Sequence, residues 1–389
     1  MIESNAIGEM MPYKSIDQMQ NALKEVIFLD RNDGKKAAGR ALGTIVEIIT
    51  FYLLKEWGFE YNICIEKSLP EYGNDDISHN VEFSLHPSKE IFQDSFQETE
   101  LPFTSQKIIA RLLRAENQYA FARYISNSLV NKQNVVRNSC NIAETDDDFI
   151  NSYLTDLNNG TFSYSTHILK KQPFAIVECK RVGIEEGMRK GPQTIEKAKQ
   201  GAYVARSVSS LQKVKTENGS IKGFIATNSN SNELDDYQTM LQNILNGDDM
   251  SLLRRFILTV GVVSNHGNWF TSENHNKEMK VLSHAYDWLL FLTDDAICFF
   301  VENFILQTQG DFTNIREAFL LSYSRKEGRK SGNIFTKVKM DYNSDQTLRK
   351  FFRNNRKLVD KWFNVISPNK DISELKSDLN KLRNKKWHE

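Results

Sequence analysis

The chain has 389 residues, of which 40% are hydrophobic and 26% are charged. These proportions are ordinary for a globular protein and exclude large-scale disorder. The length allows two domains, or one large α/β domain with helical additions. Acidic and basic residues number 50 each, so the net charge is zero and neither favours nor excludes a polyanionic partner.

The charge is unevenly distributed along the chain. Residues 316–389 hold 19 Lys and Arg against 9 Asp and Glu, which leaves an acidic remainder. The four cysteines form no CxxC pair, which favours the reduced thiols of a cytoplasmic protein over a disulfide framework or a zinc site. The N-terminal sequence lacks the basic and apolar segments of a signal peptide. Residues 285–306 are the most apolar stretch, but their four acidic residues exclude a membrane span and predict a buried helix.

The first part of the chain predicts helices followed by strands. Residues 15–30 read as a short helix, and residues 39–61 carry apolar side chains at helical spacing. The alternating segments 61–69 and 80–86 predict two strands. Residues 88–158 are polar with a mostly helical pattern, so we expect a helical insertion between core elements.

The segments after the insertion predict the rest of a sheet. Residues 161–169 and 173–181 flank Lys-Lys-Gln and are typical of a hairpin, which a helix at 192–211 follows. Two further strands are predicted at 221–227 and 255–263.

The order of these elements predicts an α/β fold with a mixed central β-sheet flanked by helices. We expect residues 1–278 to form the core with its insertion. Residues 279–389 predict a basic C-terminal region that is helical apart from a possible hairpin at 333–342, and that serves DNA recognition or dimerisation.

The stretch FAIVECKRVG places two opposite charges at the end of a strand. Glu178 and Lys180 lie two positions apart, so they project from the same face of the strand while Cys179 points away. A surface salt bridge at a sheet edge is a common alternative for this pattern. The continuous Ala-Ile-Val run, however, indicates a strand buried on both faces, where unpaired charges are costly. Glu47 adds an acid within the apolar pattern of the second helix.

These residues resemble a known motif. The Glu-Cys-Lys sequence at the end of an apolar strand, followed by a basic helix, is similar to the second half of the motif of the PD-(D/E)xK nuclease superfamily. The segment GRALGTIVEIITFYLLKEWGF resembles the opening helix of that superfamily, whose glutamate, here Glu47, often helps to hold the metal. The resemblance covers residues 36–86 and 160–265 and implies a mixed sheet of four or five strands with a helix on each side.

The resemblance also implies a set of metal ligands. Mg²⁺ is a hard cation that takes carboxylates, waters and phosphate oxygens, and it makes hydroxide available near neutral pH. Glu178, the carbonyl of Cys179, Glu47 and an upstream aspartate are the expected ligands. Lys180 is expected to stabilise the attacking hydroxide or the scissile phosphate.

The upstream aspartate departs from the family pattern, because the sequence has no Pro-Asp pair. Asp76 follows a turn and precedes an alternating strand, and it is our first candidate. Asp75 is the second candidate, and Asp156, in a turn-like context before the predicted hairpin, is the third.

Basic residues at several places predict contacts with DNA phosphates. Some of these basic residues follow the Glu178-Cys179-Lys180 sequence. Others lie in the C-terminal region, where basic and aromatic residues are interleaved over 348–363. An amphipathic helix with its aromatic side chains in the core gives the same pattern. The predicted DNA-binding residues are Arg181, Lys190, Lys197, Lys199, Gln200, Arg329, Lys330, Arg353 and Arg356.

The sequence therefore predicts a cytoplasmic, Mg²⁺-dependent, sequence-specific endonuclease of double-stranded DNA, similar to type II restriction enzymes. A homodimer is expected by analogy, because two sites related by a two-fold axis cut both strands of a palindrome. One alternative is a repair or modification-dependent nuclease of the same superfamily. A non-catalytic DNA-binding protein, in which Glu178 and Lys180 merely pair, is the other.

Overall fold

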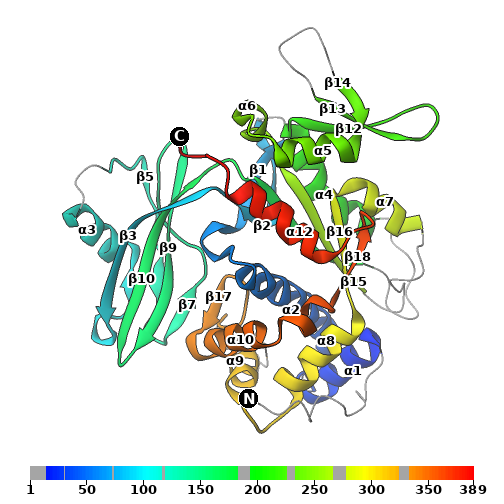
Figure 1. The fold of residues 1–389 in the computed structure, drawn as a ribbon. Helices are drawn as coiled ribbons and strands as arrows, with labels where there is room; N and C mark the ends of the chain where they lie inside the picture. The colour runs from blue at the N-terminus through cyan, green and yellow to red at the C-terminus, as the bar shows by residue number, and fades with distance from the viewer. Residues whose placement is uncertain are drawn as a thin grey trace.

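A six-stranded mixed β-sheet lies at the centre of the protein (Figure 1). The computed structural model describes residues 15–29, 31–71, 74–115, 119–182, 193–225, 233–265, 277–323 and 333–389. The central strands, in spatial order, are β1 (Ile63–Glu71), β2 (Asn74–Leu85), β11 (Ala175–Val182), β15 (Leu258–Asn265), β16 (Trp288–Leu292) and β18 (Phe363–Ser367). Strands β1, β2 and β11 are antiparallel neighbours, whereas β11, β15 and β16 run parallel.

Two helices cover the opposite faces of this sheet. Cys179 of β11 interacts with Thr50 of helix α2 (Gly34–Glu56), whereas Glu178 packs against Gly201 of helix α4 (Gln193–Val208). Because successive residues of a strand point to opposite faces, α2 and α4 lie on opposite sides of β11. The predicted class, a mixed sheet flanked by helices, is confirmed.

Helix α2 is the core helix of the protein. It has the length and apolar composition of a membrane-spanning helix, but 72% of its most apolar window is buried inside the protein, which accounts for that composition. Helices from both ends of the chain surround it. These are α1 (Ile16–Val26), α8 (Asp294–Phe300), the π-helical η3 (Val301–Leu306), α9 (Thr313–Tyr323) and α10 (Tyr342–Asn354).

Five further helices pack around this core. They are α5 (Tyr237–Asn246), α6 (Met250–Leu253), α7 (Lys277–Ala285), α11 (Arg356–Asp360) and α12 (Ile372–Arg383), with two short 3₁₀ turns, η1 (Glu60–Asn62) and η2 (Glu98–Glu100). Among these helices, α5 packs against α12 and α11 packs against α10.

The insertion at 88–158 is built mainly of strands, so the prediction of a helical insertion is wrong. Its described residues hold one α-helix, α3 (Ser105–Ala115), which packs on a five-stranded sheet at the side of the molecule (Figure 1). The strands of that sheet, in spatial order, are β3 (Ser88–Gln97), β10 (Thr161–Lys170), β9 (Asp148–Asn158), β8 (Cys140–Glu144) and β5 (Arg123–Tyr124). Phe96, Phe103 and Phe162 stack in its separate core. The strands escaped prediction because several are short and their exposed faces are polar.

The predicted hairpin of β10 and β11 does not form. Strand β10 pairs with β3 and β9 in the five-stranded sheet, whereas β11 pairs with β2 and β15 in the central sheet. The chain therefore passes from one sheet to the other between these two strands.

The C-terminal region also departs from the prediction. Residues 285–306 are not one helix, because β16 forms a buried strand before α8 begins at Asp294. Strands β16 and β18 complete the central sheet, which therefore continues past the boundary drawn at residue 278. The predicted turn at 333–342 exists as an antiparallel bridge between Phe335 and Met340.

Two small sheets complete the fold. One has the order β12 (Leu211–Lys215), β13 (Ile221–Ile225) and β14 (Glu233–Asp236), so the strand predicted at 221–227 forms outside the central sheet. The other joins the insertion to the C-terminal region, with the order β17 (Lys339–Asp341), β7 (Val135–Arg137), β6 (Ser128–Val130) and β4 (Phe103–Thr104).

Candidate active site

Two glutamates meet where β2 and β11 pair. The antiparallel register places Val177 opposite Phe83, so Glu178 and Glu82 are the next residues along. The backbone amide of Glu82 donates a hydrogen bond of 3.2 Å to Oε1 of Glu178. Both acids are buried, with Glu178 only 1% exposed. Two neighbouring buried carboxylates require a positive partner.

Lys180 supplies that positive charge. Its Nζ lies 3.3 Å from Oε2 of Glu178 and 3.7 Å from Oε2 of Glu82, and its side chain is 32% exposed. His79 approaches the same group, with Nε2 at 3.5 Å from Oε1 of Glu178. The ammonium of Lys180 thus connects a buried acid pair to solvent.

A second lysine neutralises the acids from the other side. Lys337 is nearly buried, and its Nζ lies 3.3 Å from Oε2 of Glu47 and 3.0 Å from Oε1 of Glu66. It also forms a close ion pair with Oε1 of Glu82. Glu82 therefore lies between the two lysines and links Glu47 of α2 to Lys180 of β11.

The insertion holds Lys337 in place. Asn138 follows β7, and its Nδ2 donates a hydrogen bond of 2.9 Å to the carbonyl oxygen of Lys337. The backbone amide of Asn138 donates to the carbonyl of Val338, also at 2.9 Å. A segment of the insertion thus positions a charged residue of the C-terminal region at the edge of the central sheet.

Helix α4 makes room for Glu178 by having glycine at position 201. A Cβ on Gly201 would overlap Cγ of Glu178 and would lie 2.6 Å from its Oε1. No side chain larger than hydrogen fits there without displacing the acid. The helix that follows the motif therefore serves the site through close packing.

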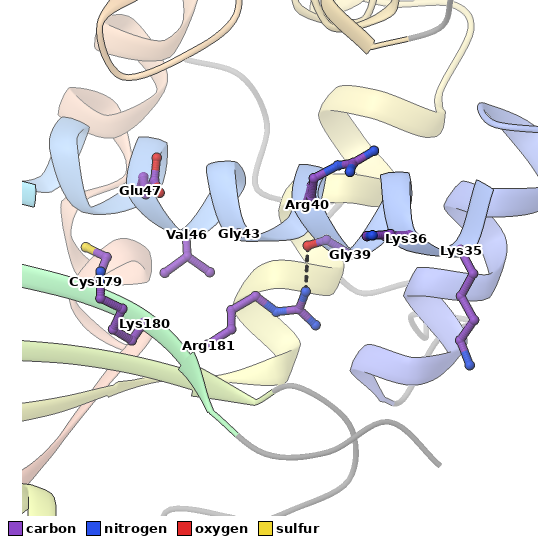
Figure 2. A pocket seen from close by; sticks show the side chains of 10 residues that line it. All are labelled: Lys35, Lys36, Gly39, Arg40, Gly43, Val46, Glu47, Cys179, Lys180 and Arg181. Atoms are coloured by element: carbon purple, nitrogen blue, oxygen red, sulfur yellow. Dashed lines mark hydrogen bonds between the residues drawn. The ribbon is translucent and has the colours of Figure 1, made fainter. Parts of the chain in front are cut away.

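Glu47 and Lys180 line an open cleft of about 740 Å³ between α2 and the end of β11. Figure 2 shows its two walls, with α2 on one side and residues 179–181 of β11 on the other. The cleft is lined by Lys35, Lys36, Gly39, Arg40, Gly43, Val46, Glu47, Cys179, Lys180 and Arg181. Five of these side chains are cationic and one is a carboxylate, so the cleft suits an anionic ligand.

Burial shifts the protonation of two residues that line the cleft. Desolvation raises the pKa of Glu47 above its usual value of 4.5, and the positive charge of Lys337 opposes that shift. Burial against α2 raises the pKa of Cys179, which stays a neutral thiol. Cys179 points away from Glu178, as predicted, and toward Thr50 of α2, so only its backbone carbonyl remains a candidate ligand.

The structure brings Glu178 and Lys180 of the predicted site together, and Glu47 is connected to them through the ion pairs of Lys337 and Glu82. Asp76 is exposed on β2, six residues from Glu82, which is about 20 Å along an extended strand. Asp156 is exposed on β9 of the other sheet. Asp75 lies in β2, but its side chain is outside the described residues. Glu82 takes the position that the sequence assigned to Asp76.

The predicted DNA-binding residues are only partly at the cleft. Arg181 lines it and donates a hydrogen bond of 2.7 Å to the carbonyl oxygen of Gly39, drawn in Figure 2. Lys199 is buried, with its ammonium 5.3 Å from the ring centre of Tyr203, whereas Gln200 is exposed on α4.

The remaining predicted contacts lie elsewhere. Arg353 and Arg356 are exposed, and Arg356 forms an ion pair with Glu56. Glu56 is nine residues from Glu47 on α2, about 14 Å along the helix axis, and lies in the direction opposite to the cleft. Lys190, Arg329, Lys330 and the side chain of Lys197 are outside the described residues.

The acids of this cluster outnumber its lysines, so the cluster carries negative charge that a divalent cation can neutralise. Four carboxylates, those of Glu47, Glu66, Glu82 and Glu178, surround two ammonium groups, which leaves a formal charge of −2 when all are ionised. Carboxylate oxygens are the ligands that Mg²⁺ prefers. Within the described ranges, no three His, Cys, Asp or Glu side chains converge closely enough to hold a metal ion. The acids thus match Mg²⁺ in charge and donor type but do not converge on one point among the described residues, and Lys337 bridges three of them.

Sequence reasoning missed Glu82, Lys337, Glu66 and His79. Glu82 carried a signal, because it is an acid between Val81 and Phe83 in an alternating strand predicted to reach the core. Lys337 carried none, since its approach depends on a contact between segments almost 200 residues apart.

Comparison with known proteins found no matching family model, no similar curated protein and no matching solved structure. The function of this chain is therefore inferred from the site itself.

Proposed function

We propose that the protein is a Mg²⁺-dependent endonuclease that hydrolyses phosphodiester bonds of double-stranded DNA, as a member of the PD-(D/E)xK superfamily similar to type II restriction enzymes. One observation carries this proposal. The ammonium of Lys180 lies between the buried acids Glu178 and Glu82 and borders a cleft with five cationic side chains. A buried acid pair and a half-exposed lysine beside an anion-binding cleft suit phosphoryl chemistry.

Each residue has a distinct task in this proposal. Glu178, held by the backbone amide of Glu82, and Glu82 itself would hold the cation, with Glu47 and the carbonyl of Cys179 beside them. When bound, Mg²⁺ would neutralise charge on the phosphate and make hydroxide available. Lys180 orients the nucleophile or the scissile phosphate, because its ammonium is fixed by two acids and still reaches solvent.

The fold supports the same proposal. A helix that bears Glu47 is followed by two antiparallel strands, an insertion, the Glu178-Cys179-Lys180 strand and helix α4, and the parallel strand β15 comes after the small sheet of β12 to β14 and two short helices. The resemblance implies a mixed sheet with a helix on each side, and α2 and α4 lie on opposite sides of the mixed central sheet. Sequence specificity and a homodimer remain part of the proposal by analogy with restriction enzymes, in which paired sites cut both strands.

The test is incubation of phage DNA with the purified protein and Mg²⁺. We expect discrete fragments with the wild-type protein and none with Lys180→Ala, because that variant loses the charge between the two acids. Lys350→Ala is a matched control, since Lys350 is exposed on α10 and does not line the cleft. Smeared products would favour a nonspecific nuclease of the same superfamily.

Two further arms separate the alternatives. Plasmid with and without base methylation distinguishes a restriction enzyme from a modification-dependent one. A protein that binds duplex DNA equally with Mg²⁺ or EDTA, and never nicks it, would be a non-catalytic DNA-binding protein.

A further inference from the structure

The amino-terminal half of α2 forms one wall of the cleft and carries three exposed cations. Lys35, Lys36 and Arg40 all line the cleft and are exposed. None of the three was expected from the sequence to contact a ligand. All three belong to one helix that lines the same cleft as Lys180, so this wall has the charge to bind an anion.

The charge on this wall is only partly neutralised by the protein. Arg40 donates to Oδ2 of Asp33 at 2.8 Å, but Arg31 binds the same carboxylate through two hydrogen bonds. Two guanidinium groups thus share one acid. Lys36 has no carboxylate partner in the part of the chain that the structure describes. The wall therefore keeps a net positive charge.

Glycine at position 43 keeps the cleft open. A Cβ built on Gly43 meets no atom within 4 Å among the described residues, although the residue is in the middle of a long helix. Glycine inside a helix costs about 1 kcal/mol relative to alanine. No packing contact accounts for that cost at Gly43, whereas a ligand that lies against the helix would need the space.

The dimensions fit a nucleic-acid strand. Eleven residues separate Lys36 from Glu47, which is about 17 Å along the helix axis. A strand of duplex DNA winds around the duplex axis, so a straight wall of this length can follow a few consecutive phosphates of one strand. This wall, from Lys36 to Glu47, is called the α2 track. It begins at the exposed cations and ends at Glu47, on the same cleft as Lys180.

We infer that the face of α2 formed by Lys36, Gly39, Arg40 and Gly43 binds the sugar–phosphate backbone of one DNA strand and leads it to Lys180. This inference rests on the proposed nuclease function. The inference can be tested separately from that function, because DNA binding to the α2 track can be measured without any cleavage.

The test measures binding without catalysis. Fluorescence anisotropy of a labelled 20-base-pair duplex in EDTA gives the Kd at several salt concentrations. Lys36→Glu is expected to weaken binding by about tenfold or more and to reduce the slope of log K against log salt by about 1. Lys132→Glu makes the same charge change in the exposed turn between β6 and β7, away from the cleft, and should change the Kd by less than about twofold.

A second variant tests the space above the helix. Gly43→Leu places a side chain in the cleft and is expected to weaken binding by about tenfold, while its thermal unfolding stays at or above the wild-type temperature because glycine is lost from a helix. The inference is overturned if Lys36→Glu and Gly43→Leu bind as tightly as the wild-type protein, or if the wild-type protein does not bind the duplex.

The result of this binding test can be distinguished from the result of the cleavage test of the proposed function. Loss of binding in these variants, together with a wild-type protein that never cuts DNA, supports the α2 track and overturns the nuclease. Wild-type cleavage with unchanged binding in both variants supports the nuclease and overturns the α2 track.

Discussion

The backbone amide of Glu82 donates a 3.2 Å hydrogen bond to Oε1 of Glu178, which joins the two acids through the main chain. Glu178 is therefore held by a donor that no substitution at position 82, proline excepted, removes. The side chain of Glu82 is left to contact Lys180 and Lys337. This division of tasks allows the contribution of each acid to be measured separately.

Replacing Glu82 by glutamine should abolish most cleavage while Glu178 stays in place. The amide keeps the size of the side chain but removes the negative charge next to Lys180. We expect cleavage to fall by more than about 100-fold, because even outer-shell partners of a metal site are worth 10- to 100-fold. Rates of plasmid nicking at saturating Mg²⁺ measure this loss.

Asp76→Asn is the matched control for that variant, because the same strand carries both residues and Asp76 is exposed. Its cleavage rate should stay within about twofold of the wild-type rate. If Asp76→Asn were inactive and Glu82→Gln active, Asp76 and not Glu82 would be the acid that completes the site with Glu178.

Lys337→Met should make folding depend on a divalent cation. The variant leaves Glu47, Glu66 and Glu82 without the ammonium that bridges them. Removing one partner of a buried charge cluster costs about 3 kcal/mol or more, so we expect a lower free energy of unfolding in EDTA. A cation that binds the freed carboxylates should restore part of that loss.

Urea denaturation with EDTA and with Mg²⁺ tests this expectation. Lys350→Met, on the exposed face of α10, should match the wild-type protein under both conditions. A Lys337→Met protein that is as stable as the wild-type protein in EDTA would show that the bridging ammonium is not needed to hold the acids together.

Gly201→Ala should destabilise the protein, although alanine usually stabilises a helix by about 1 kcal/mol relative to glycine. The new Cβ would overlap Cγ of Glu178, so either the helix or the acid has to move. We expect a lower unfolding temperature and loss of cleavage. Gly43→Ala, where the Cβ meets no atom within 4 Å, should instead raise the unfolding temperature.

A double variant tests whether the clash with Glu178, and not a general disruption of α4, destabilises Gly201→Ala. Glu178→Ala removes Cγ and should restore the stability of Gly201→Ala without restoring cleavage, which calorimetry and a nicking assay measure together. If the double variant is no more stable than Gly201→Ala, the clash lies elsewhere.

The sequence predicted those parts of the site that depend on local pattern. Glu178 and Lys180 follow from strand periodicity at the end of an apolar run, and Glu47 follows from its place within an apolar helix. Strand register could not be read from the sequence, and register is what pairs Glu178 with Glu82 instead of Asp76. Sequence distance likewise hides Lys337, which Asn138 of the insertion positions.

The fold was predictable to a similar extent. The core helices α2 and α4 have long apolar patterns, and the class of the central sheet followed from the order of elements. The strands of the insertion and β16 were misassigned as helices. Short apolar runs fit either structure, and the partner strands decide between them.

Stability should fall as the pH drops from 6.5 toward 4, partly because of His86. Burial lowers the pKa of His86 from 6.5 to about 4. Its neutral ring donates from Nδ1 to the carbonyl oxygen of Lys170 and accepts at Nε2 from the hydroxyl of Ser84, each at 2.7 Å. In this window the unfolded chain binds a proton at His86 that the folded protein does not. The free energy of unfolding therefore decreases by up to about 1.4 kcal/mol per pH unit on this account.

Replacing His86 by asparagine removes the titrating ring and keeps an amide donor toward Lys170. We expect a less stable protein at pH 7, since one hydrogen bond and some packing are lost, but a shallower fall in stability between pH 6.5 and 4. His284→Asn, at an exposed position of α7, should keep the wild-type slope. Urea denaturation at half-unit pH steps gives the slopes. An unchanged slope in His86→Asn would mean that other groups, such as His167, whose pKa burial also lowers to about 4, account for the acid sensitivity.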